Sequence, residues 1–180
     1  MSKLDFLTYK AQAIQGDLDA MYQLGICYET GMGTEVNLEE AFQCFLNAAK
    51  QEHAKAQYAV AVCYDCGLGV KENQNEALYW YKKSAQQLNG QALYKLGCMY
   101  IEGTSFISKN KVKGLELILN AYKVGFKDSE SILTFLYKLY KTSYPTHKGK
   151  STDSIFELSA LIENAKQGNE EAILIINSIL

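Results

Sequence analysis

The most regular feature of the chain is a set of small, apolar and aromatic positions that recur at a spacing of 36 residues. Five columns align at this spacing: Ala20, Ala56 and Ala92; Leu24, Val60 and Leu96; Gly25, Ala61 and Gly97; Tyr28, Tyr64 and Tyr100; and Gly31, Gly67 and Gly103. Agreement of so many columns at one spacing indicates a tandem repeat, and a period of this length is typical of solenoid proteins.

Within one repeat the pattern first predicts an amphipathic helix that ends in a glycine turn. Ala20, Leu24 and Tyr28 are four residues apart, so they lie on one stripe of a helix. The pair Gly31 and Gly33 follows this stripe. Glycine commonly ends a helix because it adopts the left-handed conformation without steric cost.

A second helix is predicted to begin at a column of asparagine and aspartate. Asn37 with Glu40 three residues later, and Asn73 with Glu76, have the spacing of a capping box, with asparagine in place of serine or threonine. We therefore expect the second helices to begin after Asn37, Asn73, Asn110 and Asp153.

Each unit of two helices cannot cover its own apolar stripe, so it must stack on its neighbours. We expect an all-α fold, a right-handed α/α superhelical solenoid of about ten helices that forms a single domain over residues 1–180. Its expected parts are a lone helix at 3–16, repeats at about 17–52, 53–88, 89–125 and 126–168, and a terminal helix at 169–180.

The repeat resembles the Sel1-like repeat family, a relative of the tetratricopeptide repeats. In the second repeat the family pattern is carried by Ala56, Tyr58, Val60, Tyr64, Gly67, Gly69, Ala77 and Trp80. The third repeat departs from it where Ser105 replaces the second glycine, and in the degenerate fourth repeat Thr134 stands in the column of Gly25. The resemblance implies a scaffold that holds a protein partner, since family members include adaptors, secretion-system effectors and toxin-neutralising proteins.

If the first helices line the concave side, as in related solenoids, their positions opposite the packed stripe would meet a partner. These positions hold Tyr22, Ile26, Glu29, Tyr58, Val62, Asp65, Tyr94, Cys98 and Glu102. Tyrosine supplies a large contact area at small entropic cost, so this ladder is a candidate protein-binding surface. The alternative is that the tyrosines only pack between adjacent helices as part of the repeat.

Composition and charge indicate an ordinary folded protein that neither associates with a membrane nor binds nucleic acid. The chain is 48% hydrophobic and 21% charged, and its net charge is -2. We expect a cytoplasmic protein with reduced cysteines, because there is no secretory signal and no apolar run near the ~20 residues of a membrane span. All 18 basic residues are lysine, which argues against sequence-specific nucleic-acid binding. Abundant lysine, asparagine and isoleucine without arginine are typical of an AT-rich bacterial genome.

Positive charge is concentrated after the first helix of the third repeat, where residues 109–150 hold nine lysines against three acidic residues. Lys109, Lys111 and Lys113 are a candidate basic patch that could steer an acidic partner by long-range attraction. The alternative is a solvated, lysine-rich loop.

The sequence offers two weak candidates for chemistry. Cys63 and Cys66 have the spacing of a redox or metal-binding pair. They fall at the C-terminal end of a predicted helix, where the dipole disfavours a thiolate, and zinc would need two more ligands. Ser108 and Lys111 match the Ser-x-x-Lys pattern of β-lactamase-type nucleophiles but are predicted to lie in a loop. We expect packing cysteines, no metal and no cofactor.

We therefore predict a non-enzymatic protein-interaction module, in one form a bacterial immunity protein that neutralises a cognate toxin. A secreted effector scaffold is one alternative. The other is a β-lactamase-like or cell-wall-directed hydrolase, because cysteine-rich relatives of the family are linked to penicillin binding. The paired cysteines of those relatives are missing here, where the corresponding positions hold Ala49, Ala56, Ala85 and Ala92. The sequence does not indicate the oligomeric state.

Overall fold

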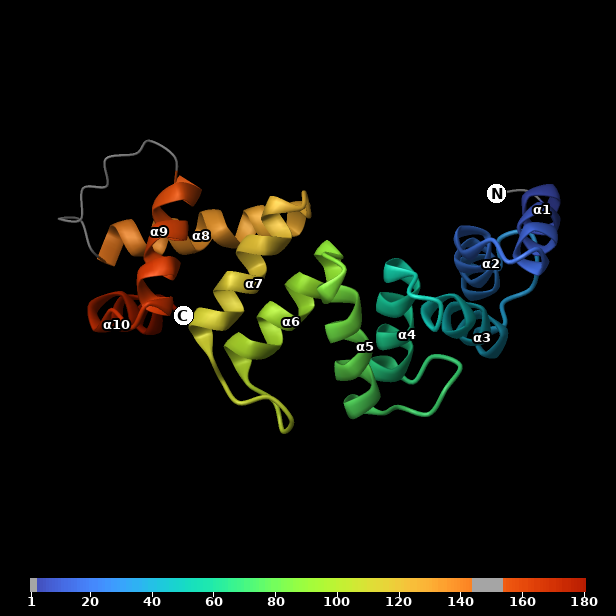
Figure 1. Cartoon of the computed structure of the whole chain (residues 1–180), viewed down its shortest axis with the longest axis horizontal. Helices are drawn as coiled ribbons and strands as arrows, with labels where there is room; N and C mark the ends of the chain where they lie inside the picture. Colours follow the sequence, from blue (N-terminus) through green and yellow to red (C-terminus); the bar gives the residue numbers. More distant parts are fainter. Residues whose placement is uncertain (1–2, 144–153) are drawn as a thin grey trace. The chain divides into compact units, whose positions relative to one another are not determined.

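The computed structural model describes residues 3–143 and 154–180, and these residues form ten helices (Figure 1). The helices are α1 (Lys3–Ile14), α2 (Leu18–Thr30), α3 (Leu38–Ala49), α4 (Ala54–Cys66), α5 (Gln74–Gln86), α6 (Gly90–Glu102), α7 (Lys111–Lys123), α8 (Lys127–Ser143), α9 (Ser154–Lys166) and α10 (Glu170–Ile179). The described part of the chain contains no strand, only an isolated bridge between Thr104 and Ile107. The predicted all-α fold of about ten helices is confirmed.

The chain divides into two compact units, Met1–Asn89 and Gly90–Leu180. The expectation of a single domain over residues 1–180 therefore stays a prediction. None of the helices in the described ranges combines the length and the apolar character required to cross a bilayer.

In the first unit, helices α1 to α5 pack on one another in chain order (Figure 1). The core between α3 and α4 is built largely from small residues, including Ala48, Ala49 and Ala56. Gly25 on α2 faces the ring of Phe45, and a Cβ atom at Gly25 would lie only 2.4 Å from that ring. The small columns of the repeat thus let neighbouring helices approach closely.

The helix caps explain why the repeat has a fixed register. The predicted asparagine column is confirmed, since the side chains of Asn37, Asn73 and Asn110 accept hydrogen bonds from amides in the first turn of α3, α5 and α7. Asp153 lies outside the described residues. The first helices are capped in the same way, by Asp17 for α2, His53 for α4 and Asn169 for α10.

The reciprocal half of the predicted capping box is wrong. The backbone amides of the three asparagines donate to the carbonyls of the tyrosine column at the end of the preceding helix, not to Glu40 or Glu76. The pairs are Asn37 to Tyr28 (2.8 Å), Asn73 to Tyr64 (2.9 Å) and Asn110 to Tyr100 (2.7 Å). In each of the three repeats, one backbone hydrogen bond therefore joins the end of the first helix to the start of the second.

Glycine is required in the turns for two reasons. Gly67 ends α4 with φ of 69°, in the left-handed region that favours glycine. Gly69 has φ of 65°, and a Cβ atom there would lie 2.0 Å from the carbonyl oxygen of Leu38 in the neighbouring repeat. In the third repeat, where Ser105 replaces the second glycine, the hydroxyl of Thr104 accepts hydrogen bonds from the amides of Phe106 and Ile107.

The second unit departs from packing in simple chain order. Helices α7, α8, α9 and α10 share one core that includes Leu115, Ile118, Leu133, Leu158 and Ile176. The last helix, α10, contacts α7 and α8 as well as α9. The unit therefore ends in a helix that folds back onto an earlier repeat.

Candidate functional site

The six predicted contact residues of the first unit lie on α2 and α4, and all six are partly exposed. They are Tyr22, Ile26, Glu29, Tyr58, Val62 and Asp65. Their partial burial means that each side chain both packs inside the unit and presents some surface to solvent. We call this set the α2–α4 surface.

The two tyrosines of the α2–α4 surface are held by rings on other parts of the first unit. The ring centre of Tyr22 lies 5.7 Å from that of Phe45 and 5.4 Å from that of His53. The ring of Tyr58 lies 5.7 Å from that of Tyr81. These contacts fix the orientation of both tyrosines while leaving part of each side chain accessible.

Glu29 is the residue of the α2–α4 surface whose charge is not compensated. Its side chain is half-buried and forms no hydrogen bond or ion pair with any of the described residues. Burial raises the pKa of its carboxyl group, because removing water disfavours the charged form. The pKa of Tyr22 is also raised, first by burial and then by the charges of Glu29 and Tyr58.

Asp65 differs from Glu29 because it takes part in internal hydrogen bonding. Its carboxylate accepts a hydrogen bond of 3.1 Å from the hydroxyl of the buried Tyr81. Its backbone carbonyl accepts a bond of 3.3 Å from the side-chain amide of Gln74. Part of the acidic character predicted for this surface therefore serves to hold α5 against α4.

In the second unit, the predicted contact residues on α6 follow the same pattern. Tyr94 is partly buried, with its ring centre 5.4 Å from that of Phe126. Cys98 is also partly buried, and burial raises the pKa of its thiol, so the sulfur is not a reactive thiolate. Glu102, at the end of α6, is exposed.

The three lysines of the predicted basic patch have different surroundings. The amine of Lys111 donates a hydrogen bond of 2.8 Å to the carbonyl of Asn177 on α10. The amine of Lys113 lies 4.5 Å from the ring centre of Tyr100, a cation–π contact. Lys109 is exposed and lines a shallow cleft of about 370 Å³ together with Lys111 and Asn177. Two of the three amines thus contribute to the packing of the second unit.

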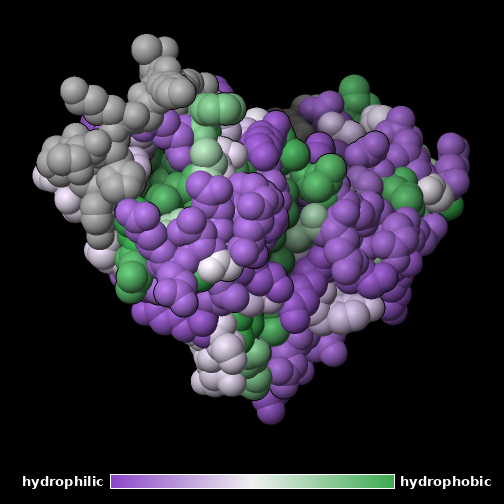
Figure 2. Space-filling model, turned by 60° about the vertical axis from the view of Figure 1, so that its left-hand side comes forward, coloured by the Kyte–Doolittle hydropathy of each residue, from purple (hydrophilic) through white to green (hydrophobic). Residues whose placement is uncertain are grey.

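The distribution of hydrophobic residues on one face of the molecule bears on the kind of partner that could bind there. On the face shown in Figure 2, hydrophilic residues predominate and hydrophobic residues form separate patches. A binding surface that mixes aromatic rings with carboxylates is consistent with this distribution.

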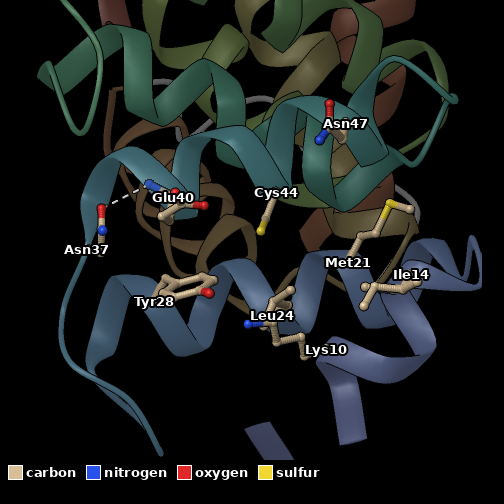
Figure 3. A pocket seen from close by; sticks show the side chains of 10 residues that line it. Lys10, Ile14, Met21, Leu24, Tyr28, Asn37, Glu40, Cys44 and Asn47 are labelled. Carbon is tan, nitrogen blue, oxygen red and sulfur yellow. Dashed lines mark hydrogen bonds between the residues drawn. The ribbon is translucent and has the colours of Figure 1, made fainter. Parts of the chain in front are cut away.

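The sequence did not reveal a cleft of about 600 Å³ in the first unit. Figure 3 shows it between α1 and α3, with Leu24 and Tyr28 of α2 between them and the sulfur of Cys44 pointing into it (Figure 3). Burial raises the pKa of Cys44 to about 11, which keeps the thiol protonated at neutral pH. The cleft lies between α1 and α3, which are not consecutive in the chain. The hydrophobic periodicity of a single helix cannot predict such a gap between two helices.

The structure does not bring together the two candidate pairs for chemistry that the sequence offered. Cys63 is buried, its pKa is raised to about 12, first by burial, and all five cysteines are free thiols. The amine of Lys111 is bonded to Asn177 and not to the exposed Ser108. No group of three or more His, Cys, Asp or Glu side chains in the described ranges could hold a metal ion.

Two solved structures resemble this chain over most of its length. A Sel1 repeat protein from Oxalobacter formigenes is 26% identical, with a TM-score of 0.70, and the match covers 94% of this chain and 66% of that chain. A protective antigen of uropathogenic Escherichia coli with an SLR fold is also 26% identical, with a TM-score of 0.64, covering 95% of this chain and 35% of that chain. The chain thus spans less than two thirds of each of these proteins, and the predicted α-solenoid class is confirmed.

An immunity protein of Pseudomonas aeruginosa is 16% identical, with a TM-score of 0.41, covering 97% of this chain and 73% of that chain. It is too distant to support an argument about this chain. No curated protein matches the chain.

The Sel1 repeat profile matches residues 18–53, 54–87 and 90–126. These segments contain helices α2 to α7 and, together, more than half of the residues. The resemblance inferred from the repeated columns is confirmed, and the chain belongs to the Sel1 repeat family.

Proposed function

We propose that this chain is a non-enzymatic module that binds a protein partner through the α2–α4 surface. Sel1 repeats are protein–protein interaction modules, which supports the general class. The observation that carries the specific surface is Glu29, a half-buried carboxylate without a hydrogen-bond or ion-pair partner among the described residues. A partly desolvated charge gains more from an incoming opposite charge than a fully solvated one does.

The chemistry around Glu29 favours a basic side chain of the partner. Tyr22 and Tyr58 belong to the same partly exposed surface, and aromatic rings can contact the aliphatic stem and the charge of a lysine or arginine. Both tyrosines are already oriented by Phe45, His53 and Tyr81. Little side-chain entropy would therefore be lost when the partner binds.

The test starts with affinity capture of the partner from the source cells and continues with calorimetry on the purified pair. We expect Glu29→Gln to weaken binding by about tenfold or more, because it removes the charge but keeps the shape. Tyr58→Ala should weaken binding as well, since it removes contact area. The control is Glu35→Gln, which neutralises an exposed carboxylate in the turn after α2 and should leave the affinity unchanged.

Two outcomes would contradict the proposal. One is the absence of any protein partner that binds more tightly than tens of micromolar. The other is a partner whose affinity is the same for the wild-type chain, Glu29→Gln and Tyr58→Ala. In that case the exposed Lys109 and its neighbours would be the next surface to vary.

Within this proposal the partner is a bacterial toxin, and the chain neutralises it in the cytoplasm as an immunity protein. The support is the family resemblance, whose members include toxin-neutralising proteins. Co-production of the captured partner with the chain tests this form: the wild-type chain should restore growth, and Glu29→Gln should restore it less. A captured partner that is harmless to the cell would favour an adaptor or a secreted effector scaffold instead.

The hydrolase alternative has less support, because the amine of Lys111 is bonded to Asn177 and the side chain of Ser108 is exposed in a loop. A chromogenic lactam assay compares the wild-type chain with Ser108→Ala. Turnover that is lost in this variant would favour the enzyme over the binding module.

A further inference from the structure

The cleft between α1 and α3 has no part in the proposed function, yet it has the size and the mixed lining of a ligand site. Its volume of about 600 Å³ lies in the range of about 300 to 1,000 Å³ that is usual for such sites. Helix α2 forms its floor, because both α1 and α3 pack on that helix. The side chains that define its chemistry come from all three helices (Figure 3): Lys10, Met21, Leu24, Tyr28, Glu40 and Asn47.

Two charges of opposite sign line the cleft, one on each wall. Lys10 belongs to α1 and Glu40 to α3, and both residues are exposed. Neither side chain forms a hydrogen bond or an ion pair with another residue in the described ranges. A ligand that carries both a basic group and a hydrogen-bond acceptor would therefore pair with the two walls at once.

The two ends of the cleft differ in polarity. Figure 3 shows Glu40 and Tyr28 at one end and Met21 and Ile14 at the other, with the thiol of Cys44 between them. The carboxylate of Glu40 and the hydroxyl of Tyr28 can both accept hydrogen bonds from an ammonium or guanidinium group. Met21 and Ile14 offer flexible aliphatic surface. One end thus suits a basic side chain, and the other suits an aliphatic one.

The length of the cleft sets the spacing of these two groups. Glu40 and Asn47 on α3 are seven residues apart, as are Met21 and Tyr28 on α2, which corresponds to a rise of about 10 Å along each helix. In the polyproline II conformation, a major form of unfolded segments, residues three positions apart point the same way and are separated by about 9 Å. We propose that the cleft binds an extended segment of a partner protein in which a basic and an aliphatic side chain are three positions apart. The amine of Lys10 and the side-chain amide of Asn47 can then pair with the backbone of the segment.

This binding site goes beyond the proposed function and does not rest on it. At 100° per residue, the cleft residues of α2 and the α2 residues of the α2–α4 surface are centred about 130° apart around the helix. A segment in the cleft would therefore leave the α2–α4 surface free. Short peptides can test the cleft without the rest of the partner.

Amide NMR of the isotope-labelled chain, titrated with blocked tetrapeptides, tests the proposal. The probe peptides hold lysine at one end, leucine at the other and two alanines between them, in both chain directions. We expect one of them to shift the amide signals of cleft residues on all three helices, with a dissociation constant of about 1 mM, because a short, flexible peptide loses conformational freedom and makes few contacts. A peptide with lysine and leucine adjacent, and one with glutamate in place of lysine, should bind at least about tenfold more weakly.

Variants of the chain show which side chains hold the peptide. Glu40→Gln should weaken binding by about tenfold, because it removes the charge that the basic side chain meets. The matched control is Glu39→Gln, an exposed carboxylate in the same first turn of α3 that does not line the cleft, and it should leave the affinity unchanged. Cys44→Phe places a ring where the thiol points into the cleft and should abolish binding. Circular dichroism and thermal unfolding should show that all three variants keep the wild-type fold.

The absence of shifts with both lysine peptides up to about 10 mM would overturn the proposal. So would equal affinities of the wild-type chain and Glu40→Gln for the peptide that binds. Glu29→Gln separates the two sites, since unchanged peptide binding in this variant supports the cleft. Shifts that vanish in Glu29→Gln but persist in Glu40→Gln would instead assign the peptide to the α2–α4 surface and exclude the cleft.

Discussion

The hydroxyl of Tyr81 donates a 3.1 Å hydrogen bond to the carboxylate of Asp65, which joins α5 to α4. Tyr81 is only 1% exposed, and its pKa is raised first by burial and then by the charge of Asp65. Asp65 therefore contributes to the stability of the first unit as well as to the α2–α4 surface. For this reason Glu29, which has no such bond, is the cleaner position at which to test binding.

A double-mutant cycle should detect the coupling between Tyr81 and Asp65. We expect Tyr81→Phe and Asp65→Ala each to lower the free energy of unfolding, with a coupling of about 1 to 3 kcal/mol, as for a hydrogen bond to a charged acceptor. Urea unfolding of the two single variants and the double variant measures it. Strictly additive effects would show that this hydrogen bond contributes nothing to stability.

Glu29→Gln should stabilise the free chain at neutral pH while it weakens partner binding. Burial raises the pKa of Glu29 in the folded state, so the folded chain holds the proton more tightly than the unfolded chain. Stability therefore falls as pH rises through the window between the ordinary carboxyl pKa and the raised folded value, and this loss persists at pH 7. Replacing Glu29 removes the loss.

Thermal unfolding at about pH 7 and about pH 4, near the ordinary pKa of a glutamate, measures this difference. Glu29→Gln should melt at a higher temperature than the wild-type chain at the upper pH. The gain in the free energy of unfolding should be less than about 1 kcal/mol, because water screens a half-exposed group. The two chains should converge at the lower pH. A variant that melts lower than the wild-type chain at pH 7 would contradict the assignment of Glu29 as an uncompensated charge.

His53 should be replaceable by residues that cap a helix. Its Nδ1 accepts a 3.1 Å hydrogen bond from the amide of Ala56, and its Nε2 lies 3.0 Å from the carboxylate of Asp19. His53→Ala should cost about 1 kcal/mol of stability, and His53→Asn should retain most of it, because asparagine is a favourable N-cap. Equal losses in the two variants, measured by chemical unfolding, would show that the cap is not the reason for the effect.

Gly69→Ala should be among the most destabilising small substitutions in the first unit. The added Cβ atom would lie 2.0 Å from the carbonyl oxygen of Leu38, so the backbone of the neighbouring repeat must move. We expect a loss above about 3 kcal/mol, combining overpacking with the unfavourable positive φ. The matched control is Gly16→Ala, which also has positive φ but meets no atom within 4 Å and should cost only about 1 to 2 kcal/mol. Similar losses at both positions would attribute the effect to backbone conformation alone.

The helices and their register could be predicted because the signals are local and repeated. The caps at Asn37, Asn73 and Asn110 and the glycine turns recur in the same columns and specify where helices begin and end. The acceptor of the cap amide could not be predicted, because it depends on the path of the turn. The acceptors are the backbone carbonyls of Tyr28, Tyr64 and Tyr100, at the end of the preceding helix.

The surroundings of the candidate site were less accessible to sequence reasoning. Helical periodicity placed Tyr22, Glu29 and Tyr58 on partly exposed positions, but it could not show that Tyr81 bonds to Asp65 on another helix. The bond between Lys111 and Asn177 joins residues 66 positions apart. Neither contact leaves a periodic trace in the sequence, since each depends on how one particular pair of helices meets.

Hydrogen–deuterium exchange of the chain, with and without its captured partner, tests the central claim most directly. Binding on the α2–α4 surface predicts slower exchange in peptides that cover Leu18–Thr30 and Ala54–Cys66, and loss of this protection in Glu29→Gln. Protection confined to Lys111–Lys123, or identical protection of the wild-type chain and Glu29→Gln, would contradict it.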